Sequence, residues 1–143
     1  MTNVQSTVDQ SPYIFDTTVR NNITLFQNDN FDESILIDIL KKVNLYDEFL
    51  SNGLLEYQCG DNGCNLSGGQ KQKIALARAL IRKYKIYLLD EISANLDHKN
   101  SQQLHNLLFN LNISFIEISH HFDMKDSRYT AVYRLNRTGN LEK

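Results

Sequence analysis

Apolar positions recur at helical spacing through the first part of the chain. A short helix is expected to begin after a cap at Thr17 or Thr18 and to run through Ile23. A longer helix is expected to begin at Asn30 or Asp32. The apolar positions of this longer helix lie three and four residues apart, so they fall on one face. They are Ile35, Leu36, Ile39, Leu40 and Val43.

The middle of the chain contains the strongest helical pattern. After a short helix predicted at residues 45–50, residues 51–65 are rich in Gly and Asn and are expected to form turns. Residues 68–83 then combine apolar and basic positions at helical spacing. The inward positions are Ile74, Ala77, Leu80 and Ile81, and the outward positions, expected to form a solvated face, are Lys71, Lys73, Arg78 and Arg82.

Short, nearly continuous apolar runs predict strands. Residues 86–90 and 113–119 are expected to be buried strands, separated by a helix at residues 97–111. Residues 4–8 are typical of the end of a strand, and residues 130–135 predict a last one. Strands of continuous apolar residues that alternate with a helix predict a parallel sheet of the α/β class.

Composition narrows the class of protein. The chain has 143 residues and a formal net charge of −2, so it is one domain at most and lacks the basic balance typical of nucleic-acid binding. No apolar run approaches the ~20 residues of a membrane helix, and the polar N-terminus is unlike a signal peptide. Cys59 and Cys64 lack the spacing of a metal site and are expected to be free thiols. These features predict a cytosolic chain.

Two carboxylates end the strand predicted at residues 86–90. Asp90 stands at its carboxyl end, where ligands bind in open α/β sheets, and a buried acid there needs a partner or a metal ion. Glu91 follows and points in another direction. One carboxylate is suited to Mg²⁺ and the other to an attacking water. A solvated or turn-capping pair is an equally good interpretation of these two residues alone.

A glycine-rich turn opens the helix predicted at residues 68–83. The turn is Ser67-Gly68-Gly69-Gln70. Unpaired main-chain N–H groups at the start of a helix, together with a hydroxyl, are suited to an anion such as phosphate. The simpler interpretation is a helix cap by Ser67. Both can hold, because they use the same N–H groups.

A histidine follows the strand predicted at residues 113–119. The imidazole of His120 could reach a phosphate, but with His121 beside it a surface histidine is the simpler interpretation. His120 alone therefore identifies no site, and neither does Gln10 near the N-terminus.

The order of five segments carries more information than any one of them. They are Gln10-Ser11-Pro12-Tyr13-Ile14-Phe15, Leu66-Ser67-Gly68-Gly69-Gln70, Ile86-Tyr87-Leu88-Leu89-Asp90 with Glu91, Ala94-Asn95-Leu96-Asp97, and Ile118-Ser119-His120. In that order they resemble the Q-loop, the signature motif, Walker B with its catalytic glutamate, the D-loop and the H-loop of an ABC transporter nucleotide-binding domain. The chain is similar to such a domain from the Q-loop onward.

Two further segments resemble exporter-type members of this family. Residues 15–23 resemble a Thr-Ile-Arg-x-Asn-Ile stretch, and residues 56–63 resemble the segment near the coupling helices of the membrane domain. The resemblance implies an α/β class, a partial P-loop NTPase (ABC ATPase) fold with a parallel sheet core and an α-helical subdomain. Residues of about 11–82 would form the helical subdomain with the signature motif, and residues of about 83–143 the C-terminal part of the α/β core.

The resemblance also implies a head-to-tail dimer with two ATP molecules between the domains. Asp97 would bridge the two ATP sites across the dimer. The residues that would touch the ATP held by the opposite subunit are Ser67, Gly68, Gly69 and Gln70.

Four other residues would serve the ATP of their own subunit. Asp90 and Gln10 would bind Mg²⁺, and Gln10 would also help to hold the attacking water and couple the site to the membrane domain. Glu91 would be the catalytic glutamate, and His120 would hold the γ-phosphate. Such positioning and charge stabilisation is most of what phosphoryl transfer needs. The catalytic roles therefore fall to Glu91, His120 and Gln10.

One family motif is not found in these 143 residues, namely the phosphate cradle Gly-x-x-x-x-Gly-Lys-Ser/Thr. Gly63 and Gly68 have the right separation, but Gly and Gln follow instead of Lys and Ser or Thr. The family places the cradle, its flanking strand and helix, and an adenine-stacking aromatic residue upstream of the Q-loop. We therefore expect weak or absent ATP binding by the chain alone. We also expect strands 86–90 and 113–118 to lack sheet partners and cover.

The sequence thus predicts an ATP-binding and ATP-hydrolysing subunit of an ABC exporter, or a fragment of one, that works with ATP and Mg²⁺. Its expected partners are a second nucleotide-binding domain and a transmembrane domain, at the cytoplasmic face of the membrane. One alternative is a catalytically incompetent half-domain that acts in trans as an interaction module. A non-transport ABC ATPase acting on DNA or ribosomes is a further alternative. The exporter-like segments and the acidic balance argue against it, so no nucleic-acid partner is expected.

Overall fold

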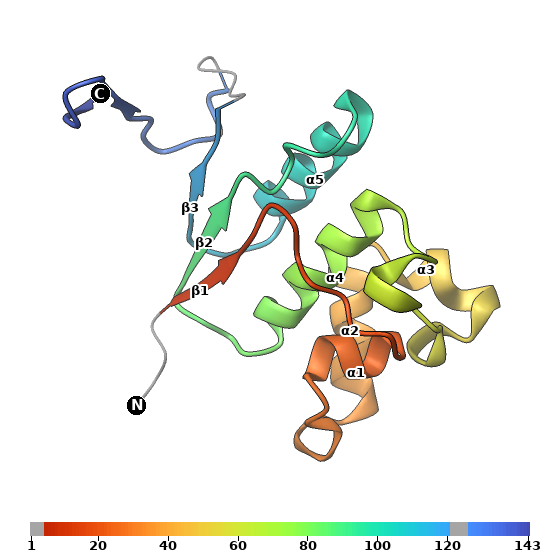
Figure 1. The fold of residues 1–143 in the computed structure, drawn as a ribbon. Coiled ribbons are helices and arrows are strands. Elements are labelled where there is room, and N and C mark those ends of the chain that lie inside the picture. The colour runs from red at the N-terminus through yellow and green to blue at the C-terminus, as the bar shows by residue number, and fades with distance from the viewer. Residues whose placement is uncertain (1–4, 121–125) are drawn as a thin grey trace.

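Two groups of elements make up the structure, a parallel sheet and a set of helices, which lie side by side in Figure 1. The computed structural model describes residues 5–120 and 126–143. Strands β1 (Gln5–Val8), β2 (Ile86–Asp90) and β3 (Phe115–Ile118) pair in parallel in the order β1-β2-β3. The predicted parallel α/β sheet is therefore confirmed, although residue 4 of the first predicted strand lies outside the described residues.

The described part of the chain covers one face of this sheet and leaves the other open. Tyr87 and Leu89 of β2 are buried on the side of the helices, whereas Ile116 and Ile118 of β3 are 56% and 59% exposed on the other side. The prediction that both strands are buried is therefore wrong for the outer face, because the helices in Figure 1 pack on one side of the sheet. The expectation that these strands lack sheet partners is also wrong, because β2 pairs on both sides and β3 pairs with β2. The expected lack of cover applies, within the described residues, to the outer face alone.

In residues 5–120 and 126–143, five α-helices follow the predicted order. They are α1 (Val19–Thr24), α2 (Glu33–Lys42), α3 (Tyr46–Phe49), α4 (Gly68–Leu80) and α5 (His98–Asn110). Short 3₁₀ turns at Asn28–Asn30, Leu50–Asn52, Leu54–Glu56 and Asp61–Gly63 connect them. None of the helices in the described part of the chain is both long enough and apolar enough to cross a bilayer.

The starts of the first two helices agree with their sequence signals. Thr18 caps α1, because its hydroxyl oxygen accepts a hydrogen bond from the main-chain N–H of Asn21 at 3.1 Å. Asp32 occupies the N-cap position of α2. Of the apolar face predicted for α2, four residues are buried, but Ile35 is 37% exposed and lies outside the core. The buried four are Leu36, Ile39, Leu40 and Val43.

Helix α4 runs through the middle of the helical group, and its apolar positions are buried as predicted. Arg78 of α4 and Arg82, two residues after its end, are not a solvated face, however. The guanidinium group of Arg78 donates to the main-chain oxygen of Asn22 at 2.9 Å. The guanidinium group of Arg82 donates to the main-chain oxygens of Ile23 (3.3 Å) and Thr24 (3.1 Å). These carbonyls end helix α1 and have no partner within it, so the arginines satisfy them.

The two lysines of α4 are also only half-exposed. Lys71 donates to the main-chain oxygen of Asn62 at 2.8 Å. Lys73 donates to the carboxylate of Glu48 at 2.6 Å and to the main-chain oxygen of Asn44 at 3.2 Å. The basic residues of α4 therefore hold neighbouring segments in place, which a helical periodicity does not reveal.

The last strand is shorter than predicted. Within the predicted residues 130–135, only β4 (Arg134–Leu135) is a strand, and it pairs antiparallel with β5 (Leu141–Glu142) in a separate hairpin. The turn between them is closed by Asn136, whose N–H donates to the main-chain oxygen of Asn140 at 2.9 Å. The pairing therefore stays local to this turn.

A buried glutamate ties residues 126–129 to the sheet and to α5. The side chain of Glu117 is 3% exposed and accepts from the hydroxyl of Tyr129 and from Nε2 of His105 at 2.8 Å. The other ring nitrogen of His105 lies 2.9 Å from the main-chain oxygen of Ser101, which can only accept. A protonated ring donates from both nitrogens, so this arrangement favours the charged form of His105. The hydrogen bond to Glu117 accordingly raises the pKa of His105 above its ordinary value, although burial opposes it.

This pair predicts a pH-dependent stability. Because the folded chain raises the pKa of His105, the stabilisation is full below about pH 6.5 and is lost as the pH rises through the raised pKa. We expect the free energy of unfolding, measured by urea denaturation, to fall over that range. The His105→Gln variant should lose this part of the pH dependence, and the variant of exposed His98, His98→Gln, should keep it. An unchanged pH profile in His105→Gln would contradict the assignment.

Candidate functional site

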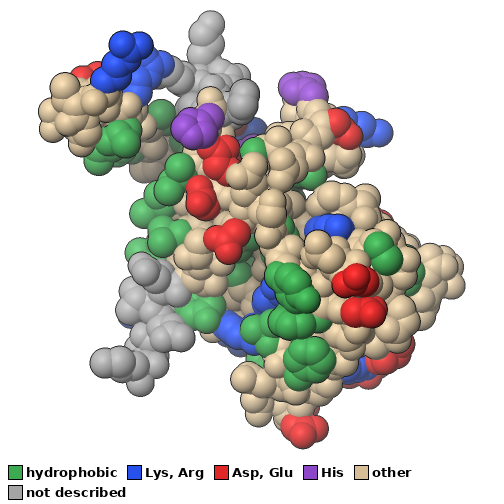
Figure 2. Space-filling view, viewed as in Figure 1, with side chains coloured by type: hydrophobic (Ala, Val, Ile, Leu, Met, Phe, Trp, Pro, Cys, Tyr) green, Lys and Arg blue, Asp and Glu red, His purple; other side chains and the backbone are tan. Residues whose placement is uncertain are grey.

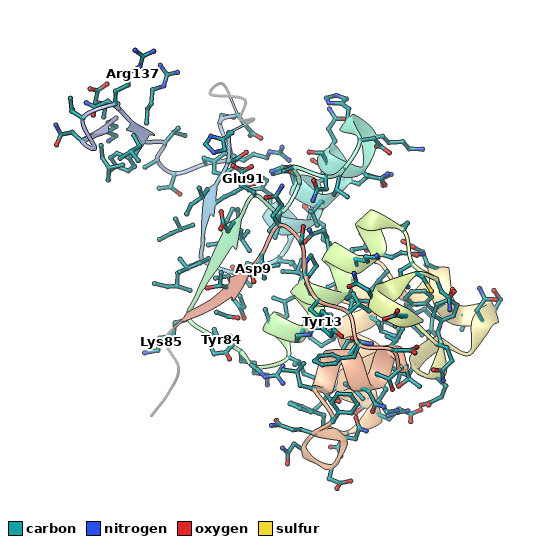
Figure 3. All side chains as sticks on the ribbon, viewed as in Figure 1. Asp9, Tyr13, Tyr84, Lys85, Glu91 and Arg137 are labelled. Atoms are coloured by element: carbon teal, nitrogen blue, oxygen red, sulfur yellow. The ribbon has the colours of Figure 1, made fainter. Side chains whose placement is uncertain are left out.

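The carboxyl ends of the three parallel strands meet at one edge of the sheet. The register pairs Val8 with Leu89 and Asp90 with Ile118, so the residues that follow each strand come together there. Figure 3 places Asp9 and Glu91 at this edge and Lys85 at the opposite end of β2. In Figure 2 carboxylates and a histidine gather at the same edge. This is where ligands bind in open α/β sheets.

Glu91 and His120 form the best-defined contact at this edge. One carboxylate oxygen of Glu91 accepts from the main-chain N–H of His120 at 3.1 Å and lies 3.3 Å from Nε2 of its imidazole. The side chain of Glu91 is 14% exposed, whereas that of His120 is 88% exposed. The carboxylate is thus held in place, and the imidazole keeps an open side for a ligand. His121, its neighbour in the sequence, lies outside the described residues.

The backbone at Glu91 is strained. Its φ is +51°, in the left-handed region, which costs a residue with a Cβ about 1 kcal/mol or more. Its main-chain N–H donates to the oxygen of Ile118 at 2.9 Å, so the parallel pairing with β3 continues up to this residue. The turn aims the Glu91 side chain toward His120 and away from the direction that a continued strand would give it.

Asp90 was expected to be a buried carboxylate, and the structure shows it exposed. It is exposed, because burial in β2 falls off at both ends of the strand, and Asp90 lies beyond the cover of the helices. Gln10, just after β1, is also exposed. Carboxylate and amide oxygens are ligands that Mg²⁺ favours, and both are open at the same edge. Within residues 5–120 and 126–143, however, no three His, Cys, Asp or Glu side chains form a preformed metal site.

The turn at residues 67–70 is a capping box. The hydroxyl oxygen of Ser67 accepts from the main-chain N–H of Gln70 at 3.1 Å, and the side-chain oxygen of Gln70 accepts from the N–H of Ser67 at 2.9 Å. The cap interpretation is therefore confirmed. Because the Ser67 oxygen accepts, its own O–H remains able to donate to an anion. The side-chain N–H of Gln70 is used within the chain, since it donates to Glu48 at 2.9 Å.

The segment of residues 94–97 joins this turn to the edge of the sheet. A Cβ at Gly68 would lie 3.3 Å from Leu96, so a side chain there would press on the segment. The side-chain N–H of Asn95 donates to the hydroxyl of Ser11, next to Gln10, at 3.3 Å. Residues 94–97 therefore contact both groups of candidate residues.

Asp97 is the N-cap residue of α5. One of its carboxylate oxygens accepts from the main-chain N–H of Asn100 at 2.8 Å, and the other accepts from the side-chain N–H of Asn100 at 2.7 Å. These bonds hold the pKa of Asp97 below its usual value. Asp97 thus has a structural role within the chain, and it is exposed as well.

The structure therefore sorts the predicted residues into two places. Asp90, Glu91, His120 and Gln10 lie at the carboxyl edge of the sheet, and Glu91 and His120 touch. The capping turn and Asp97 lie at the starts of α4 and α5, which pack together. Sequence reasoning placed Asn95 in the segment of residues 94–97 without giving it a role, and it missed Gln72, a buried residue of α4. Gln72 stands four and seven residues before two buried apolar residues, a spacing that indicates a second buried face of α4.

Comparisons with known proteins agree with this arrangement. A family model described as ABC transporter matches residues 2–94. The chain is 42% identical over 106 residues to ABC transporter B family member 17 of Arabidopsis thaliana, covering 72% of this chain and 8% of the relative. It is 47% identical over 92 residues to leptomycin B resistance protein pmd1 of Schizosaccharomyces pombe, covering 63% of this chain and 7% of the relative. It is 37% identical over 108 residues to an ATP-dependent lipid A-core flippase of Francisella novicida, covering 74% of this chain and 18% of the relative.

A solved structure gives the same result for the fold. A bacterial Atm1-family ABC exporter with ATP bound superposes with a TM-score of 0.69 at 26% identity, covering 82% of this chain and 21% of that one. The predicted class, a partial α/β P-loop NTPase fold, is therefore confirmed. The chain spans less than a fifth of the length of each of the three relatives named above.

The capping box predicts a measurable stability term. The Ser67→Ala variant removes the acceptor for the N–H of Gln70 and should lower the free energy of unfolding by about 1 kcal/mol. Urea denaturation followed by circular dichroism measures the difference. The matched control is Ser51→Ala, in an exposed 3₁₀ turn, which should change stability by less than about 0.5 kcal/mol. Equal stability of the two variants would show that the cap does not support α4.

Proposed function

The chain belongs to the ABC transporter family, and we propose that it forms part of the ATP-hydrolysing domain of an exporter. The observation that carries this proposal is the contact between Glu91 and His120 at the carboxyl edge of the sheet, beside exposed Asp90. A fixed carboxylate next to an open imidazole suits an attacking water and a phosphate, respectively. Names of relatives such as lipid A-core flippase and leptomycin B resistance protein support an exporter.

In this proposal each residue at the carboxyl edge of the sheet has a different role in the hydrolysis of one ATP molecule. Bound ATP and Mg²⁺ supply the transferable phosphoryl group and its neutralising charge. Asp90 and Gln10 are the oxygen donors that would hold Mg²⁺. Glu91 orients the attacking water and takes its proton. His120 donates from its exposed imidazole to a phosphate oxygen. The placement of Glu91 by its hydrogen bond with the N–H of His120 supports these roles.

The capping turn would serve the ATP of a second nucleotide-binding domain, in a head-to-tail dimer. Ser67 and Gly68 are exposed at the start of α4, where main-chain N–H groups and the positive end of the helix dipole favour an anion. The free O–H of Ser67 adds a donor. Asp97 lies exposed at the start of the neighbouring helix, in a position to bridge the two domains.

A surface on the helical group supports a transmembrane partner. The two exporter-like segments lie side by side, because the N–H of Val19 donates to the oxygen of Tyr57 and that of Cys59 to the oxygen of Thr17, both at 2.9 Å. Three aromatic rings pack edge to face near them. They are Tyr13, Phe15 and Phe26, of which Tyr13 is 61% and Phe26 57% exposed. Figure 3 shows Tyr13 on the helical group, and Figure 2 shows apolar side chains gathered there. Such patches mark contacts with other proteins.

The separation of a sheet from a group of helices supports the domain division that we propose. Residues of about 11–82 would form the helical subdomain and residues of about 83–143 the C-terminal part of the core, at the cytoplasmic face of the membrane. Because the phosphate cradle pattern does not occur in these 143 residues, the proposal assigns it to residues beyond them, on the same or another polypeptide. Hydrolysis is therefore tested in a domain completed with a cradle-bearing half from an exporter relative.

The catalytic assignment is tested first in this completed domain. The Glu91→Gln variant should lose ATP hydrolysis by at least about 100-fold while ATP binding, measured by equilibrium dialysis, stays within about twofold. Exposed Glu33→Gln is the matched control and should keep full turnover. Unchanged turnover in Glu91→Gln would contradict the proposed role of Glu91. If neither the unsubstituted completed domain nor its Glu91→Gln variant binds ATP, the proposed function is contradicted.

The dimer assignment is tested separately. The Ser67→Arg variant places a long charged side chain at the start of α4, where the proposal puts the ATP of the second domain. ATP-driven dimerisation of the completed domain, measured by light scattering in the Glu91→Gln background, should be lost. Ser51→Arg, in an exposed turn, is the control that should still dimerise. Normal dimerisation of Ser67→Arg would count against a head-to-tail arrangement through this turn.

A further inference from the structure

A buried side chain connects helix α4 to the segment that carries Gln10. Gln72 is 4% exposed, and its side-chain N–H donates to the main-chain oxygen of Gln10 at 2.6 Å. The two residues are 62 positions apart in the sequence. The contact therefore joins the helix that starts with the capping turn to the loop that follows β1.

Packing alone does not explain an amide at position 72. The side-chain oxygen of Gln72 is buried and has no hydrogen-bond partner within the described residues. A buried polar atom without a partner costs free energy, which an apolar side chain of similar size would avoid. Within residues 5–120 and 126–143, the hydrogen bond that the side chain of Gln72 makes is to Gln10, so this contact is what the amide provides.

The loop is held by α4 at its other end as well. The guanidinium group of Arg78 donates to the main-chain oxygen of Tyr13 at 3.1 Å. Gln72 and Arg78 thus fix the two ends of residues 10–13, while the hydroxyl of Ser11 accepts from Asn95. The side chain of Gln10 is exposed, so its position depends on where these contacts place its main chain.

We propose that Gln72 is a positioning residue for hydrolysis, which sets the place of Gln10 relative to the helix that carries Ser67. The inference rests on the proposed roles of Gln10 at one ATP and of Ser67 at the other. A displacement of α4 when Ser67 engages the second domain is then passed through Gln72 to the main chain of Gln10. The two ATP sites are connected by this hydrogen bond inside a single chain.

The contact itself is tested in the 143-residue chain. The Gln72→Met variant keeps the size of the side chain but cannot donate. Hydrogen–deuterium exchange of the peptide covering residues 9–16 should become about 5- to 10-fold faster, the loss expected for one hydrogen bond. Exchange in α5 should not change, which shows that the fold is kept. The matched control is Gln103→Met, exposed on α5, which should leave residues 9–16 unaffected.

A second measurement does not depend on the variant folding. In the unsubstituted chain, NMR should detect a through-hydrogen-bond coupling between the side-chain nitrogen of Gln72 and the carbonyl carbon of Gln10. Its absence, or unchanged exchange of residues 9–16 in a folded Gln72→Met chain, would overturn the inference.

The consequence for hydrolysis is tested in the completed domain, with Glu91→Gln measured in parallel. Gln72→Met should lower kcat about 5- to 10-fold with the KM for ATP within about twofold, because water placement and not nucleotide binding is affected. If Glu91→Gln abolishes turnover while Gln72→Met leaves kcat unchanged, the inference fails and the proposed function stands. If Glu91→Gln leaves turnover unchanged, the proposed catalytic roles fail, and this inference fails with them.

Discussion

Arg78 of α4 and Arg82, just after its end, hold the structure together at the end of α1. A helix of only six residues leaves its last carbonyls without partners inside the helix, and Arg78 and Arg82 donate to three of them. Hydrogen bonds from a charged donor are worth about 1.5–3 kcal/mol each, more than neutral ones. Burial, with the nearby charge of Arg82, lowers the pKa of Arg78, which is the cost of placing this donor inside. Through these contacts α4 becomes the element to which the loop after β1 and the helical group are both fixed.

Local signals in the sequence predicted the elements but not the direction of every side chain. The cap at Ser67, the cap at Thr18 and the parallel sheet follow from residue type and spacing, so they were predicted correctly. Arg78 and Arg82 were expected to face solvent, because a periodicity cannot show that the last carbonyls of α1 lie opposite them. In the sequence, Glu117 is a charged residue among the apolar residues of β3. It is buried because His105 and Tyr129, from other elements, supply its partners.

The candidate site shows the same division between local and long-range information. The motifs placed the chemistry at the ends of β2 and β3, and the structure puts Glu91 against His120 there. Three other features depend on segments that are far apart in the sequence and meet at this edge of the sheet. They are the positive φ of Glu91, the exposure of Asp90 and the hydrogen bond from Asn95 to Ser11. No local pattern encodes these features, since each needs a neighbour more than twenty residues away.

The open face of the sheet has a consequence for aggregation and degradation of the chain. Ile116 and Ile118 lie on that face, and β3 ends the described sheet with an unpaired edge. Exposed apolar strands at an edge are templates for pairing with other chains, and they are what chaperones and proteases recognise. Produced by themselves, these 143 residues are therefore expected to aggregate or to be degraded through this face.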